Sequence, residues 1–134
     1  MNAKELVGKI FKQWEEGDSA PFFAALAPDV IWTAKGTTPI SGTFHGKEAY
    51  LKEVYQPLLS IFTGPTRCQV KQIIGEGDTV AVEWHGETPT RSFGTYSQDY
   101  CWLFRVREKD QAIVEVTGYF DTALVNDLLS AAPK

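Results

Sequence analysis

Asp121 follows a segment rich in Val, Ile and aromatic residues, and it is the acidic residue best placed for acid–base chemistry. Residues 113–120 (IVEVTGYF) are typical of a β-strand, because β-branched and aromatic side chains favour a pleated sheet. Alternation puts Thr117, Tyr119 and Asp121 on one face, and Val114, Val116 and Phe120 on the other. If the first face lines a cavity, Asp121 lies in an apolar wall, where a carboxylate gains basicity and can move protons.

The position of Asp121 also fits a purely structural role. It directly precedes residues 122–131, which the sequence predicts to be a short helix. An Asp at the N-cap accepts a hydrogen bond from an N–H of the first helical turn. The residues alone leave both interpretations open: a base in a cavity or a helix cap.

The two preceding predicted strands carry the other candidate site residues. Strand alternation places Val82 and Trp84 of the first strand on the cavity side, with Tyr96, Gln98, Tyr100 and Trp102 of the second. An apolar cavity with a few polar groups is the usual form of a small-molecule site. Gln98 and Tyr100 could donate hydrogen bonds to an enolate oxygen. The alternative is a structural core, which is favoured for the tryptophans.

The chain's composition excludes several kinds of site. The net charge is −4 with no Lys/Arg cluster, so nucleic-acid binding is not expected. Strand alternation turns His85 away from the cavity, His45 lies in a loop, and Cys68 and Cys101 are isolated in sequence. We therefore expect no metal and no cofactor. The sequence shows no signal peptide and no apolar run long enough to span a bilayer, so we expect a cytoplasmic protein that does not enter membranes.

The predicted elements form a single α+β domain over residues 1–134. Helices are predicted at 3–16, shortly after Ser19, at 46–62 with a kink or break at Pro57, and at 122–131. Strands are predicted at 30–35, 66–76, 79–89, 95–107 and 112–121, with tight connections between the later ones. Helices followed by consecutive long strands indicate an antiparallel sheet with helices on one face.

The strands carry large apolar side chains on both faces, so both faces need cover. Helices can cover one face of the sheet. We expect a second copy of the chain to cover the other, giving a homodimer through residues such as Leu103, Val114 and Val116.

The order of these elements accompanies three recognisable segments: Trp32 with residues 36–49 (GTTPISGTFHGKEA), residues 96–106 (YSQDYCWLFRV), and residues 119–122 (YFDT). Together they resemble the SnoaL-like family, within the superfamily of ketosteroid isomerase, limonene epoxide hydrolase and nuclear transport factor 2. The resemblance covers nearly the whole chain. It implies a cystatin-like, cone-shaped fold in which a strongly curved antiparallel sheet wraps around helices.

The resemblance carries over only part of the known catalytic residues. The base of ketosteroid isomerase would fall at Thr33, which cannot act as a base, although the position implies a place in the pocket. The oxyanion-hole residues of that enzyme would fall at Ile10 and Trp102. The last-strand Asp of limonene epoxide hydrolase is matched by Asp121, but its Arg/Asp pair would fall at Trp84 and Gly86.

Two functions from different classes follow. The first is a cofactor-free isomerase, cyclase or lyase in which Asp121 acts as acid and base on a hydrophobic carbonyl substrate. The alternative is a non-catalytic module for binding a hydrophobic ligand or for dimerisation, and epoxide hydrolysis is a third, minor hypothesis. The expected substrate-binding residues are Thr33, Trp84, Gln98, Tyr100, Trp102 and Tyr119.

Overall fold

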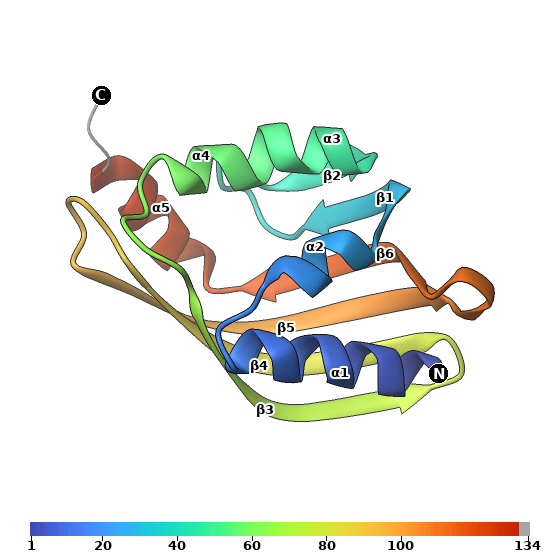
Figure 1. The fold of residues 1–134 in the computed structure, drawn as a ribbon. Coiled ribbons are helices and arrows are strands. Elements are labelled where there is room, and N and C mark those ends of the chain that lie inside the picture. Colours follow the sequence, from blue (N-terminus) through green and yellow to red (C-terminus); the bar gives the residue numbers. More distant parts are fainter. Residues whose placement is uncertain (132–134) are drawn as a thin grey trace.

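The helices precede most of the strands along the chain, as the change in hydrophobic period predicts. The computed structural model describes residues 1–131 (Figure 1). Its helices are α1 (Ala3–Glu15), α2 (Ala20–Ala25), α3 (Lys47–Tyr50), the π-helical η1 (Leu51–Tyr55), α4 (Gln56–Leu59), the 3₁₀ turn η2 (Glu108–Asp110) and α5 (Thr122–Ala131). None of the helices in this part of the chain is both long and apolar enough to cross a bilayer.

Helix α1 illustrates how local sequence sets these elements. Asn2 Oδ1 accepts a hydrogen bond from the Glu5 N–H at 2.9 Å, and Glu5 Oε1 accepts one from the Asn2 N–H at 3.2 Å. This reciprocal cap satisfies two N–H groups that the helix leaves free. The side chains at helical spacing, among them Leu6, Ile10 and Phe11, are buried, so the helix is held by its apolar stripe.

The strands form one six-stranded sheet in the order β2-β1-β6-β5-β4-β3. The strands are β1 (Leu26–Ala34), β2 (Gly42–His45), β3 (Arg67–Glu76), β4 (Thr79–Pro89), β5 (Thr95–Arg107) and β6 (Ala112–Phe120). All neighbours are antiparallel except β1 and β6, which run parallel. The predicted α+β fold with a curved sheet is confirmed, while β2 replaces part of a predicted loop.

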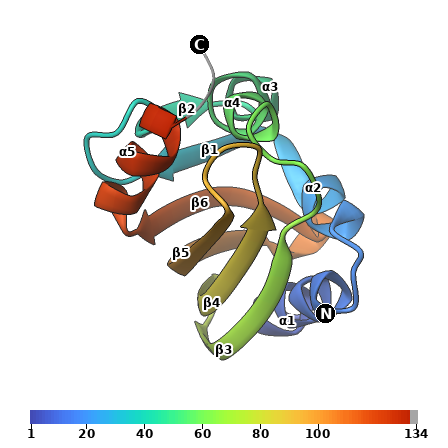
Figure 2. The same ribbon diagram turned by 90° about the vertical axis from the view of Figure 1, so that its left-hand side faces the viewer.

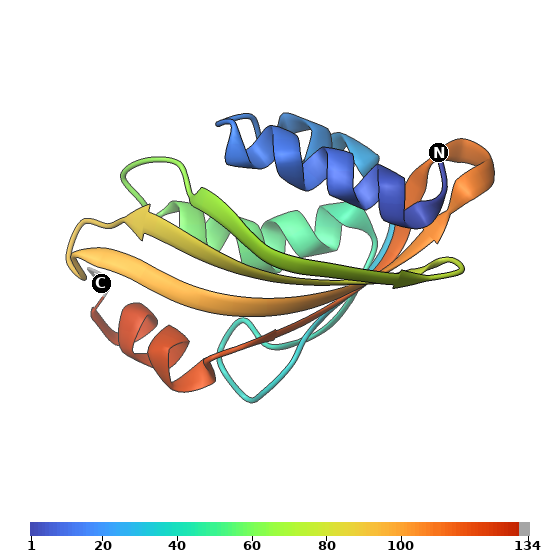
Figure 3. The same ribbon diagram turned by 90° about the horizontal axis from the view of Figure 1, so that it is seen from below.

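The helices cover the inner face of this sheet. Helix α1 contacts β3, β4 and β5, and α3 contacts β1 and β2. Figures 2 and 3 show the sheet curling past these helices, with α5 following β6 at one end. Along β5, exposed and buried residues alternate, apart from the half-buried Tyr100. Trp102 and Phe104 therefore enter the core, while Cys101 and Leu103 face outward.

The register between β5 and β6 shows that the inward-facing residues of β6 differ from those that the sequence predicted. Trp102 pairs with Gly118, and Cys101 pairs with Tyr119. Directly opposed residues share a face of the sheet, so Gly118 faces inward and Tyr119 outward. Val116 is fully buried and is therefore not part of the outer apolar face expected for a dimer.

Candidate functional site

An aromatic cavity lies between the helices and the inner face of the sheet. Its volume is about 190 Å³. The walls come from the helical elements α1, α2, α3, η1, α4 and α5, and from the inner sides of β1, β4, β5 and β6. Rings dominate these walls: Trp14, Phe22, Phe23, Trp32, Tyr50, Tyr55, Phe62, Trp84, Tyr96, Tyr100, Trp102 and Phe120. None of the described lining residues has a charged side chain, so the cavity favours an uncharged, ring-containing guest.

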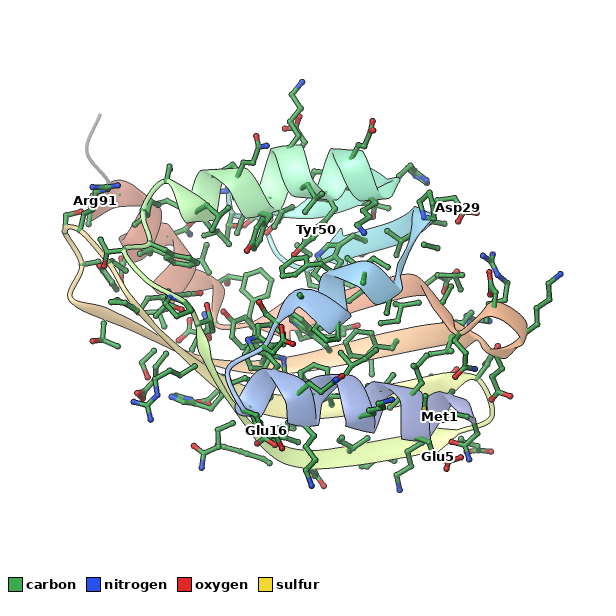
Figure 4. All side chains as sticks on the ribbon, viewed as in Figure 1. Met1, Glu5, Glu16, Asp29, Tyr50 and Arg91 are labelled. Carbon is green, nitrogen blue, oxygen red and sulfur yellow. The ribbon has the colours of Figure 1, made fainter. Side chains whose placement is uncertain are left out.

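Ring stacking holds the walls in place. Trp32 stacks on Tyr50 with centroids 3.8 Å apart, and Trp84 stacks on Tyr100 at 4.2 Å. Trp102 stands edge-on to Trp84 at 4.9 Å. Offset and edge-on pairs are favourable beyond the area that they bury, so the cavity is preformed by its own rings. Figure 4 shows Tyr50 on the inner side of the helical segment that covers the cavity.

Four tyrosines line the cavity from two sides. Tyr50 and Tyr55 come from α3 and η1, and Tyr96 and Tyr100 from β5. Burial is the main cause that raises the pKa of each of these phenols. The hydroxyls therefore stay neutral near pH 7 and act as hydrogen-bond donors or acceptors.

A π-helical turn allows both helix tyrosines to reach the cavity. The Gln56 N–H donates to the carbonyl oxygen of Leu51, five residues earlier. Such a turn holds one more residue than an α-helical turn. The α-helical period puts Tyr50 and Val54 on one stripe, and the wider turn brings Tyr55 to the same side. Tyr55 is not expected at the cavity from an α-helical period, and the local signal for a different turn is Pro57, which lacks an N–H.

Gln98 lies behind the hydroxyl groups rather than on the cavity wall. Its side chain is 1% exposed. Its Nε2 donates to Tyr96 Oη and to the carbonyl oxygen of Asp121, each at 3.0 Å. Its Oε1 accepts from the backbone N–H of Asp121 at 3.0 Å and of Asp99 at 3.1 Å. With these four contacts in place, Gln98 orients Tyr96 and does not itself reach the cavity.

The Asp121 carboxylate caps α5. The side chain is exposed, and Oδ1 accepts a hydrogen bond from the Leu124 N–H at 3.2 Å. Asp121 is not among the residues that line the cavity. The prediction that Asp121 lies in an apolar wall is therefore wrong. Asp121 comes directly after the last residue of β6, where the chain leaves the sheet and begins α5. A catalytic role for Asp121 stays a prediction.

The remaining expected site residues divide between the two faces of the sheet. Trp84, Tyr100 and Trp102 line the cavity, where strand alternation placed them. Tyr119 is 45% exposed on the outer face. Thr33 also faces outward, because its neighbours Trp32 and Ala34 line the cavity and successive residues of a strand point to opposite faces. The pocket positions expected for Tyr119 and Thr33 are both corrected.

A glycine on β6, Gly118, could have indicated which residues of this strand face inward. A Cβ added at Gly118 would lie 3.0 Å from Trp102 Nε1. A glycine inside a strand often marks a close approach of another group. Gly118 therefore provides room for the Trp102 indole, which fixes the inward face of β6.

A hydrogen-bonded cluster of polar side chains lies outside the cavity, around His85 on β4. His85 Nδ1 lies 2.8 Å from Asp99 Oδ1, and Nε2 lies 3.0 Å from Ser97 Oγ and 3.2 Å from Glu87 Oε2. The hydrogen bond to Asp99 is the largest cause that raises the pKa of His85. Within residues 1–131, no group of three or more His, Cys, Asp or Glu side chains could hold a metal ion.

Comparisons with known proteins agree on the fold. A family model described as a SnoaL-like domain matches residues 7–116. No curated protein matches the chain significantly.

Three solved structures illustrate the similarity. An NTF2-like protein from Burkholderia thailandensis is 22% identical, with 99% of each chain covered and a TM-score of 0.77. TerC co-crystallised with polyporic acid is 23% identical, with 94% of this chain and 96% of that chain covered and a TM-score of 0.71. A putative SnoaL-like polyketide cyclase from Jannaschia is 18% identical, with 96% and 92% covered and a TM-score of 0.71.

Proposed function

Since this chain belongs to the SnoaL-like domain family, we propose that its cavity binds a compact, largely aromatic molecule that carries an acceptor oxygen. The observation that carries the proposal is the uncharged, ring-lined wall, which includes four tyrosines. The volume of about 190 Å³ is below the roughly 300–1,000 Å³ typical of drug-sized ligands. The ligand is therefore small, and rings fill most of the space.

The tyrosines supply the polar part of this recognition. Tyr96 Oη accepts a hydrogen bond from Gln98 Nε2, which leaves the Tyr96 proton available to another acceptor. A carbonyl or enol oxygen of the ligand fits that donor, and Tyr100 lines the same wall. The co-crystallisation of TerC with polyporic acid supports an aromatic, oxygen-bearing ligand in a protein of this fold.

A second candidate is a cyclase or isomerase reaction in which Asp121 moves a proton. Burial is the main cause that raises the pKa of Tyr96, and the negative charge of Asp121 adds to it, so the carboxylate is close enough to influence this hydroxyl group. The SnoaL-like polyketide cyclase among the similar structures supports this class of chemistry. Binding remains the better-supported function, because none of the described lining residues is a carboxylate or a histidine.

Tryptophan fluorescence can test the binding proposal, because Trp14, Trp32, Trp84 and Trp102 all line the cavity. We compare acetonaphthone with ethylnaphthalene, which has a similar size and no acceptor oxygen. We expect the ketone to bind more tightly, by roughly 3- to 10-fold for one net hydrogen bond.

The Tyr96→Phe and Tyr100→Phe variants should reduce that advantage, whereas the outer-face control Tyr119→Phe should keep it. If neither probe quenched the fluorescence, or if Tyr119→Phe had the same effect as the cavity variants, the proposal would be overturned.

A further inference from the structure

A second, polar groove lies beside the aromatic cavity. It has a volume of about 490 Å³. The end of α1, the start of β3 and two residues of β4 line it, with the charged and titratable side chains Glu15, Glu16, Arg67, His85 and Glu87. The uncharged cavity and the charged groove thus differ sharply in the chemistry that they offer to a ligand.

The two spaces adjoin at the end of α1. Trp14, Ser19, Pro65 and Thr66 line both the cavity and the groove. At this boundary, Trp14 Nε1 donates to the carbonyl oxygen of Thr66 at 3.3 Å. This contact joins α1 to the segment before β3, so the same two residues border the cavity on one side and the groove on the other.

The groove carries more negative than positive charge. Arg67 lies opposite Glu87 in the register of β3 and β4, and Glu87 Oε2 lies 3.2 Å from His85 Nε2. The one arginine of the groove is thus outnumbered by the three carboxylates of Glu15, Glu16 and Glu87. Glu15 Oε2 accepts a hydrogen bond from the Val70 N–H at 2.8 Å, so Glu15 is held towards β3. Among the described residues, neither Glu15 nor Glu16 forms an ion pair.

The end of α1 increases this excess. The carbonyl groups at a helix C-terminus carry partial negative charge, so cations are stabilising there and carboxylates are not. Glu15 is the last residue of α1 and Glu16 is its C-cap. Figure 4 shows Glu16 at this end of the helix, on the side where β3 begins. The groove therefore favours a cationic group and disfavours an anionic one.

Building on the proposed function, we propose that the cavity and the groove bind one bipartite molecule, with an apolar ring system in the cavity and a cationic amine in the groove. The shared boundary at Trp14 and Thr66 places the two parts of the ligand next to each other. The uncharged wall of the cavity favours the ring system of the ligand, and the carboxylates of the groove favour a positive charge over a negative one.

Three probes with one ring system test this inference: naphthylethylamine, naphthylethanol and naphthylacetate. We expect the amine to bind most tightly and the carboxylate least, with a ratio on the order of 10-fold between them for two partly exposed charge contacts. The ratio should shrink at high ionic strength, because exposed charges are screened.

In the Glu16→Gln/Glu87→Gln double variant, the affinities for the amine, the alcohol and the carboxylate should become similar, while the affinity for the alcohol should stay unchanged. Glu76→Gln, at the far end of β3 and exposed, is the matched control and should keep the order. If all three probes bound equally to the unaltered protein, the bipartite site would be refuted and the cavity would stand. If none bound, the proposed function itself would fail.

Discussion

Gln98 Nε2 lies 3.0 Å from Tyr96 Oη and 3.0 Å from the carbonyl oxygen of Asp121. One buried amide therefore connects the cavity wall to the junction between β6 and α5. The oxygen of this amide accepts from the Asp121 N–H, so Gln98 binds both the N–H and the carbonyl oxygen of Asp121. The position of Tyr96 and the start of α5 are coupled through this side chain.

Gln98→Leu removes this connection at similar size. The Asp121 N–H and Tyr96 Oη lose a partner, and a buried polar group without a partner costs about 1–3 kcal/mol. We expect a lower free energy of unfolding in urea and a smaller preference for acetonaphthone over ethylnaphthalene. Gln72→Leu, whose side chain is exposed on β3, is the control. Equal effects of the two variants would argue against a special role for Gln98.

The variants Asp121→Ala and Asp121→Asn distinguish a helix-capping role of Asp121 from a role as a catalytic base. As the cap of α5, Asp121 accepts from the Leu124 N–H, and loss of such an oxygen costs about 1 kcal/mol. We expect a lower melting temperature for Asp121→Ala and little change for Asp121→Asn. If the Asn variant also lost turnover on a carbonyl substrate while its stability was unchanged, Asp121 would be a base as well as a cap.

Gly118→Ala should destabilise the protein. The new Cβ would lie 3.0 Å from Trp102 Nε1 and 3.2 Å from Trp102 Cδ1, and overpacking of this kind costs about 1–3 kcal/mol. Gly8→Ala is the matched control, because its Cβ would meet only Ile73 Cδ1 at 3.8 Å. In a helix, that change should stabilise by up to about 1 kcal/mol. Urea unfolding of both variants measures the contrast, and a neutral Gly118→Ala would show that Trp102 can move.

From the His85–Asp99 pair we expect a pH range in which its contribution to the free energy of unfolding is greatest. Hydrogen bonding to Asp99 raises the pKa of His85 above 6.5, and hydrogen bonding to His85 lowers the pKa of Asp99 below 3.8. The His85 contribution is complete below pH 6.5 and is lost as pH rises through the raised value. The Asp99 contribution is complete above pH 3.8 and is lost as pH falls through the lowered value.

Thermal unfolding from pH 3 to 9 should therefore show the contribution of this pair at its greatest between about 4 and 6.5. His85→Gln should remove the decline on the alkaline side of that window. An identical profile for the variant would show that the pair contributes nothing measurable, as many exposed ion pairs do.

The outer sheet face leads us to propose a homodimer. Leu103 is 36% exposed and Tyr119 is 45% exposed on this face, next to the Arg105–Glu115 ion pair at 3.0 Å. Light scattering at micromolar concentration should give twice the mass of the chain. Leu103→Asp should shift the mass to that of one chain. A monomer before the substitution would contradict the proposal.

The sequence alone predicted the order of the elements apart from β2, and the spacing of the long strands. Strands β4 and β5 occupy the predicted ranges 79–89 and 95–107, because alternation over long segments is a strong local signal. The same alternation placed Trp84, Tyr100 and Trp102 on the cavity side. Period 3.6 likewise identified the apolar stripe of α1.

Only the tertiary structure decided how these elements meet. The register of β6 against β5 turned Tyr119 outward and Gly118 inward, because a choice of one residue moves every side chain of a strand to the other face. The π turn that brings Tyr55 to the cavity arises from a backbone hydrogen bond, Gln56 to Leu51, that side-chain periodicity does not reveal. Gln98 could be assigned to the backbone of Asp121 only once β5 and the end of β6 lay side by side, since hydrogen-bond partners distant in sequence are set by packing.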